Sequence, residues 1–141
     1  NSYILSTSAV ESPNLMRAFG CDGYFRINNS IGFGTAVAEA LVDCNGGLEG
    51  FCSYQDQRTI QRNIGSFKLG DLRSEVDSSA LDMGKMFRQV GKIGGLDVFF
   101  VKLKQYQGQV EYRFVWQIAG ESDAYIDIEC PNAVQFCERV T

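Results

Sequence analysis

VEYRFVWQI, residues 110–118, is the stretch of sequence that decides the fold. Every second residue is apolar, namely Val110, Tyr112, Phe114, Trp116 and Ile118. Glu111, Arg113 and Gln117 alternate with them, and Val115 is the one exception to the alternation. Alternation with a period of two is typical of a β-strand that buries one face. The sequence therefore predicts a strand with one face in the core and a polar face in solvent.

Two flanking runs extend this pattern on either side of the central stretch. In residues 97–106 one face is apolar, while the other is apolar at Val98 and Phe100 and charged at Lys102 and Lys104. Residues 124–130 alternate apolar and polar side chains. The first connection, residues 106–109, contains Gly108, which can adopt a positive φ in a hairpin turn. The second connection is the polar turn of residues 120–123. Three runs with short connections predict an antiparallel meander.

The N-terminal half predicts helices and short strands. Ser12 and Pro13 are typical of a helix start, and Gly20 of a helix end. A longer helix is expected between Asn28 and Asp43, with its first turn weakened by glycines, so that it starts nearer Thr35. The other expected elements are short strands at residues 3–5, 24–27, 51–54 and 65–69, and a second helix from Ser78 or Ser79 to Val90. The order predicts a single α+β domain over residues 1–141, with a helix packed on a central antiparallel sheet.

Composition and charge exclude some classes of protein. The chain has a net charge of −4 and no cluster of Lys and Arg. Binding to nucleic acid regardless of sequence depends on such clusters, because they neutralise phosphates. No apolar run approaches the roughly 18 residues of a membrane-spanning helix. The chain begins at Asn1, so we expect that a leader has been removed.

The five cysteines lack the spacing of a zinc site, and no histidine accompanies them. A secreted protein with two disulfides and one remaining thiol is the preferred interpretation. Cys44 and Cys52 flank a glycine-rich stretch that a disulfide could close, and Cys137 is either spare or a partner of Cys130. A reduced protein with five packed thiols is the alternative.

The absence of histidine removes the commonest catalytic arrangements, including Ser-His-Asp and Cys-His pairs. Catalysis by two carboxylates remains open, as in glycosidases. A solvated sheet face with cross-strand pairs is the preferred alternative to catalysis. We expect this face to bind a partner, and its residues are Glu111, Arg113, Gln117, Asp127 and Glu129. Neither the Gly32-x-Gly34 pair nor the acidic residues after Gly120 fit a dinucleotide or EF-hand motif, so no cofactor and no metal are expected.

Three stretches carry a resemblance to a known family. They are Cys21-Asp22-Gly23-Tyr24-Phe25, the helix with Val37 and Ala38, and the late run Tyr125-Ile126-Asp127-Ile128-Glu129-Cys130. Over roughly residues 19–130 the chain resembles the ribonuclease-like secreted effectors of powdery mildew fungi, which in turn resemble small guanyl-specific fungal ribonucleases. The resemblance implies a microbial-ribonuclease-like fold, a Cys21–Cys130 disulfide and residues 1–18 as an N-terminal extension.

The same resemblance implies that catalysis has been lost. The ribonucleases use a glutamate, an arginine and at least one histidine, whereas this chain has no histidine and carries Val98 where the arginine is expected. We therefore expect a secreted virulence or avirulence effector that is not an enzyme. It would act as a monomer in the host cell or apoplast, on a host protein or weakly on RNA, and be recognised by a plant immune receptor.

The contacts are expected on the candidate binding face and on loops near residues 45–65 and 70–80, because loops on a rigid scaffold commonly carry binding. Two other functions remain open. One is a secreted hydrolase with paired carboxylates, and the other is a small secreted lectin or toxin-like module.

Overall fold

A computed structural model describes residues 1–57, 59, 73–74, 82, 85, 95–120 and 123–140 of the chain. Its main sheet has three strands in the order β1 (Ser2–Ser8), β6 (Glu111–Ile118) and β3 (Cys44–Phe51). Both outer strands pair with β6 in antiparallel register. The predicted central strand is therefore confirmed, and β6 is the middle of the sheet.

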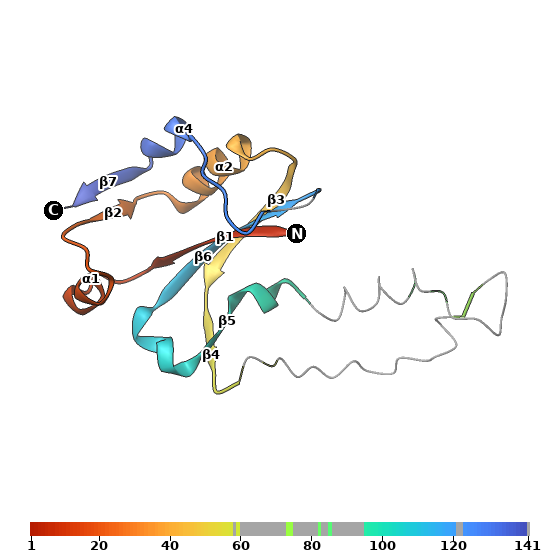
Figure 1. The fold of residues 1–141 in the computed structure, drawn as a ribbon, viewed down its shortest axis with the longest axis horizontal. Helices are drawn as coiled ribbons and strands as arrows, with labels where there is room; N and C mark the ends of the chain where they lie inside the picture. Colours follow the sequence, from red (N-terminus) through yellow and green to blue (C-terminus); the bar gives the residue numbers. More distant parts are fainter. Residues whose placement is uncertain are drawn as a thin grey trace.

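Two smaller ladders flank this sheet (Figure 1). β2 (Tyr24–Ile27) and β7 (Cys137–Val140) pair antiparallel. β4 (Ser53–Gln55) and β5 (Val101–Leu103) pair parallel. These two ladders join segments that lie far apart in the sequence.

Helical segments connect the strands, and the first of them begins and ends as the sequence predicts. Ser12 caps α1 (Pro13–Phe19), which ends at Gly20 in the left-handed conformation. Asn29 caps α2 (Ser30–Ala40) by accepting a hydrogen bond from the Gly32 amide. The remaining helices are α4 (Pro131–Val134) and the 3₁₀ helices η2 (Leu96–Phe100) and η3 (Lys104–Gln109).

The hydrophobic core lies between α2, α4 and one face of β6. Its buried members are Ala36, Val37, Leu41, Phe114, Trp116, Ile118 and Ala133. The Trp116 indole Nε1–H donates to the Gly34 carbonyl at 2.9 Å, so the polar atom of this large ring is satisfied. Figure 1 shows α2 and α4 together on one side of the main sheet, with β4 and β5 on the other.

The other face of β6 is also buried, and here the predicted solvated face is wrong. Val115 has no exposed surface and Glu111 is only 4% exposed. The polar alternation of residues 111–117 therefore reflects a second packed layer under the sheet, which includes β5 and η2.

The predicted meander is wrong on both sides of β6. Residues 96–109 form η2, β5 and η3 instead of one long strand, and residues 123–130 contain no strand. Gly108 does not carry the positive φ expected of the turn; Val110 does, at 41°. β6 is instead flanked by β1 and β3, which pair with it on either side. Side chains of these two strands extend both faces of the sheet next to those of β6.

The N-terminal half follows the sequence more closely. The short strands predicted at residues 3–5 and 24–27 are confirmed within β1 and β2. The helix predicted to start nearer Thr35 begins at Ser30 and ends before Leu41. The stretch between Cys44 and Cys52 is the strand β3 and not a loop, while α4 and β7 had no counterpart among the predicted elements.

The architecture is α+β, with a helix on an antiparallel sheet, as expected. The predicted strand at residues 65–69 lies outside the described residues, as does the predicted helix up to Val90 except for Asp82 and Lys85. Within the described part, no helix has the length and apolarity needed to cross a bilayer.

Candidate functional site

Glu111 lies at the centre of a polar cluster on the face of the sheet that points away from α2. Its Oε1 atom accepts hydrogen bonds from Ser6 Oγ at 2.8 Å and from Arg113 Nε at 2.5 Å. Its Oε2 atom pairs with the Lys102 ammonium. We call these four residues, Ser6, Lys102, Glu111 and Arg113, the Glu111 cluster. Strand register explains the grouping, because β1 places Ser6 directly opposite Arg113, two residues beyond Glu111 on the same face.

Each cation of the cluster is also held by a second group. Lys102 Nζ donates to Gln109 Oε1 at 2.5 Å and lies 5.1 Å from the centroid of the Tyr106 ring. Arg113 Nη1 donates to the Phe99 carbonyl at 2.6 Å. The cluster thus ties β1, β5, β6 and both 3₁₀ helices together, and its three charged side chains are each fixed by more than one contact.

The surroundings of Glu111 set its protonation. Burial acts to raise the pKa of its carboxyl group, but hydrogen bonds from Lys102, Arg113 and Ser6 outweigh burial and lower the pKa from 4.5 to about 2. The carboxylate is therefore ionised at neutral pH. A general acid needs a pKa near the working pH, so Glu111 is suited to holding cations and not to donating protons.

Cys52 lies beside the cluster as a buried thiol. Its backbone N–H donates to the Glu111 carbonyl at 2.9 Å. Burial raises the pKa of the Cys52 thiol, and the nearby Arg113 and Lys102 charges only partly offset this effect. Because the thiolate is the nucleophilic form, this environment does not activate the sulfur.

A second carboxylate, Glu49, lies on the opposite face of the sheet. It pairs with Phe114 across β3 and β6 and accepts a hydrogen bond from Ser30 Oγ at 2.8 Å. Burial raises the pKa of the neighbouring Tyr112 hydroxyl. Since Glu49 and Glu111 face opposite sides, these two acids do not converge as a hydrolase with paired carboxylates requires.

The five residues of the expected binding face do not share one surface. Glu111 is buried, while Arg113 and Gln117 are half-buried on β6. Asp127 and Glu129 are exposed, and they lie in a segment without strand structure. The structure therefore brings Glu111 and Arg113 together as an ion pair and leaves Asp127 and Glu129 outside the sheet.

The expected disulfides are not formed in the structure, where all five thiols are free. Cys44 opens β3 and Cys52 follows its last residue, so an extended chain separates their Cα atoms by about 25 Å at ~3.3 Å per residue. A disulfide needs about 4.4–6.8 Å, which contradicts the Cys44–Cys52 pair. The Cys21 thiol contacts the Phe19 carbonyl at 3.6 Å, and the Cys130 thiol contacts the Ala36 carbonyl at 3.3 Å.

Several members of the site could not be found by sequence reasoning. The sequence places Lys102 at the charged end of the strand predicted over residues 97–106, and Ser6 carries no signal for a polar cluster. Tyr54 was also missed, although its Oη accepts the Glu111 backbone N–H at 2.7 Å. The one available signal was the unlike charge of Lys102 and Glu111, which alone does not identify a pair. In the described ranges, no three His, Cys, Asp or Glu side chains are grouped to hold a metal ion.

Comparisons with known proteins give no family assignment. No protein-family model matches the sequence, and neither a curated protein nor a solved structure shows significant similarity to it.

Proposed function

We propose that this protein is a secreted fungal effector with a ribonuclease-like fold that acts in a plant host by binding and not by catalysis. The proposal starts from the resemblance in residues 21–25 and 125–130. The α+β architecture, with α2 packed on an antiparallel sheet, is compatible with it. The lack of histidine supports the loss of ribonuclease chemistry.

The observation that carries the non-catalytic part is the state of Glu111. Its carboxylate has two cations and a hydroxyl as hydrogen-bond donors and is almost completely buried. Every contact in this cluster joins parts of the scaffold. A carboxylate of this kind stabilises the fold, and it offers neither an exposed base nor a raised pKa to a substrate.

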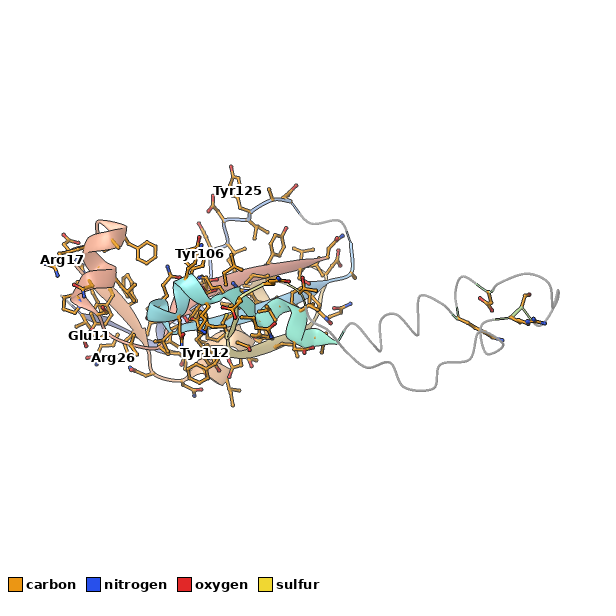
Figure 2. The ribbon with its side chains drawn as sticks, turned by 90° about the horizontal axis from the view of Figure 1, so that it is seen from below. Glu11, Arg17, Arg26, Tyr106, Tyr112 and Tyr125 are labelled. Carbon is orange, nitrogen blue, oxygen red and sulfur yellow. The ribbon has the colours of Figure 1, made fainter. Side chains whose placement is uncertain are left out.

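Exposed aromatic side chains support binding to a host protein. Phe25 is 71% exposed, Phe51 is 64% exposed and Tyr125 is 78% exposed. Tyr125 points away from the ribbon in Figure 2. Aromatic residues are enriched among the residues that dominate protein–protein binding, so these three are the first candidates for contact with the host target or with an immune receptor.

The charges of the described residues support weak binding to RNA at most. Lys102 and Arg113 are committed to Glu111. Arg26 lies 3.6 Å from both Glu11 and Glu138, and Figure 2 shows Arg26 beside Glu11. The net charge of −4 also disfavours binding to phosphates.

An RNA digestion assay tests the loss of catalysis. The purified wild-type protein and the Glu111→Gln variant are incubated with total RNA, with an active guanyl-specific ribonuclease as positive control. We expect both to leave the RNA intact. Cleavage by the wild-type protein that persists after repurification would contradict the proposal, whether or not the variant retains it, whereas cleavage that is lost on repurification comes from a contaminating nuclease.

Expression in leaves tests the effector role. The wild-type protein and the variants Tyr125→Ala, Phe51→Ala and Phe25→Ala are tagged and recovered from the tissue with their bound proteins. We expect a reproducible host protein to copurify with the wild type and to be lost with at least one variant. Gln105→Ala, at an exposed position outside the expected binding face, is the control for an exposed polar substitution. If no plant protein is retained and no immune response occurs in any host line, the effector role is wrong.

A further inference from the structure

β1 forms one edge of the main sheet, with β6 on its inner side. Figure 2 shows β1, in pale red, at the margin of the sheet, followed by β6 and β3. An edge strand presents a row of unpaired backbone N–H and C=O groups, which are a template for another strand.

Two hydrogen bonds identify the groups that face outward. The Ala9 N–H donates to the Val110 carbonyl at 2.9 Å, and the Ile118 N–H donates to the Asn1 carbonyl at 3.0 Å. Bonded pairs alternate along an antiparallel ladder, so the odd-numbered residues of β1 bond to β6. The N–H and C=O groups of the even-numbered residues, Ser2, Ile4, Ser6 and Ser8, point to the open edge.

The sequence of this edge strand lacks the features that usually prevent pairing. Ser2–Ser8 contains no charged residue, proline or glycine, and its register with β6 has no bulge. Ile4 is 48% exposed and Leu5 is 39% exposed, although they lie on opposite faces of the strand. Natural edge strands are commonly protected by lysine, proline or bulges, and β1 has none of these.

A neighbouring segment approaches the edge without pairing with it. The Asp123 N–H donates to the Tyr3 hydroxyl oxygen at 3.2 Å. The segment that carries Tyr125 passes beyond β1 in Figure 2. Among the described residues, however, no backbone hydrogen bond joins residues 123–130 to β1.

We propose that a second copy of this chain pairs with the open edge, β1 against β1 in antiparallel orientation, to make one sheet of six strands. The pairing is centred on Leu5, which lies opposite Leu5 of the partner. Ile4 then lies opposite the partner's Ser6, and Ser2 opposite the partner's Ser8. This register places even-numbered residues opposite even-numbered residues, as the outward-facing groups require, and it uses the whole strand.

The sequence of the strand favours a copy of itself as the occupant. Because Ser2–Ser8 is uncharged, two copies can approach without like-charge repulsion. The two-fold axis brings two exposed leucine side chains together at its centre. This inference goes beyond the proposed function and does not depend on it; a monomer, as expected from the sequence, and an edge reserved for a peptide of a host protein are the competing outcomes.

Sedimentation velocity over a wide range of concentrations tests the proposal. We expect the wild-type mass to rise from 15.7 kDa towards twice that value as concentration increases. Leu5→Lys and Leu5→Glu should each remain monomeric, because the substituted charges face each other at the axis. An equal mixture of the two variants should restore a dimer. Phe25→Lys, which places the same charge on an exposed position of β2, should behave as the wild type.

Hydrogen exchange on the wild-type protein provides a measurement that needs no variant. Dimerisation should slow exchange at the Ile4 and Ser6 amides as concentration rises, while the Leu5 amide, already bonded within the sheet, changes little. A wild-type protein that stays monomeric at every concentration overturns the proposal. A dimer that survives both Leu5 substitutions, or that forms without protection of Ile4 and Ser6, also overturns it.

Discussion

Arg113 Nε lies 2.5 Å from Glu111 Oε1, and both residues project from the same face of β6 into a buried layer. Residues two apart on a strand share a face, so this pair is local in sequence. Lys102 and Ser6 come from other parts of the chain and complete the site. The Glu111–Arg113 pair is therefore the local part of the cluster, and Ser6 and Lys102 bind to it from distant parts of the sequence.

Removing the carboxylate should strongly destabilise the fold. Glu111→Ala leaves Lys102 and Arg113 with nearly buried charges and no anion, which typically costs about 3–5 kcal/mol. The free energy of unfolding in urea measures this loss. Glu129→Ala, on an exposed residue of the same type, should change the stability by no more than about 0.5 kcal/mol. Equal effects of the two substitutions would show that the cluster does not support the fold.

The contribution of Glu111 should depend on pH in a defined direction. Its pKa is about 2 in the folded protein and 4.5 as the reference value for the unfolded chain. A lowered pKa stabilises the fold above the unfolded value, and the contribution is lost as the pH falls from 4.5 towards 2. At roughly 1.4 kcal/mol per pKa unit, the full contribution is about 3 kcal/mol.

Paired measurements isolate this effect from other acidic groups. The stability of the wild-type protein minus that of Glu111→Gln should be constant from pH 7 to pH 5 and should shrink below pH 4.5. A difference that is independent of pH over the whole range would contradict the lowered pKa.

Two aromatic substitutions on the same face of the sheet should have unequal effects. Phe114 is 2% exposed and packs edge-on against Phe33, with 5.3 Å between the ring centroids. Phe51 is largely exposed and packs edge-on against Tyr112, with 5.1 Å between the ring centroids. Phe114→Ala should lower the free energy of unfolding by about 3–5 kcal/mol. Phe51→Ala should lower the free energy of unfolding by only about 0.5–1.5 kcal/mol, which is the stabilisation that an aromatic pair typically contributes. Similar losses in thermal or urea unfolding would contradict the described packing.

Two glycines of α2 should respond differently to alanine. A Cβ at Gly32 would lie 2.6 Å from the Phe136 ring, while a Cβ at Gly34 would lie 3.4 Å from Phe114. Alanine gains about 0.8–1 kcal/mol of helix propensity at either position. At Gly32 we expect overpacking against the Phe136 ring to destabilise the fold by about 1–3 kcal/mol, which exceeds that gain. Gly32→Ala should therefore melt at a lower temperature than Gly34→Ala, and the reverse order would contradict the close contact between Gly32 and the Phe136 ring.

The position of β3 predicts the outcome of disulfide mapping. Digestion of the oxidised protein without reductant should yield no peptide that links Cys44 to Cys52, because the strand holds them at opposite ends. Mass spectrometry of the fragments measures this directly. A Cys44–Cys52 link in folded protein would show that residues 44–51 are not a strand.

Local signals in the sequence were sufficient for several elements. The Ser12-Pro13 start and Gly20 end of α1 depend on backbone groups within a few residues, and the structure has both. The strand character of residues 111–118 follows from alternation within the segment. In each case the interactions that decide the structure are close in sequence, so the residues alone were informative.

Pairing partners and buried polar contacts required the tertiary structure. The alternation of residues 124–130 looks like that of a strand, yet those residues form none, while β1 and β3 pair with β6 across long sequence separations. Equally, the spacing of Glu111 and Arg113 in the sequence does not show whether their side chains face solvent or a buried layer. That distinction depends on Lys102, Ser6 and the covering 3₁₀ segments, which reach Glu111 only after the chain has folded.

By itself, the sequence determined both ends of α1, the central strand and the lack of histidine chemistry, because each is a property of local residue types. Only the tertiary structure decided that β6 is buried on both faces, that Glu111 is a structural anion, and that Cys44 and Cys52 lie apart. The physical reason is that burial and ion pairing are properties of the space around a side chain, and distant segments fill that space.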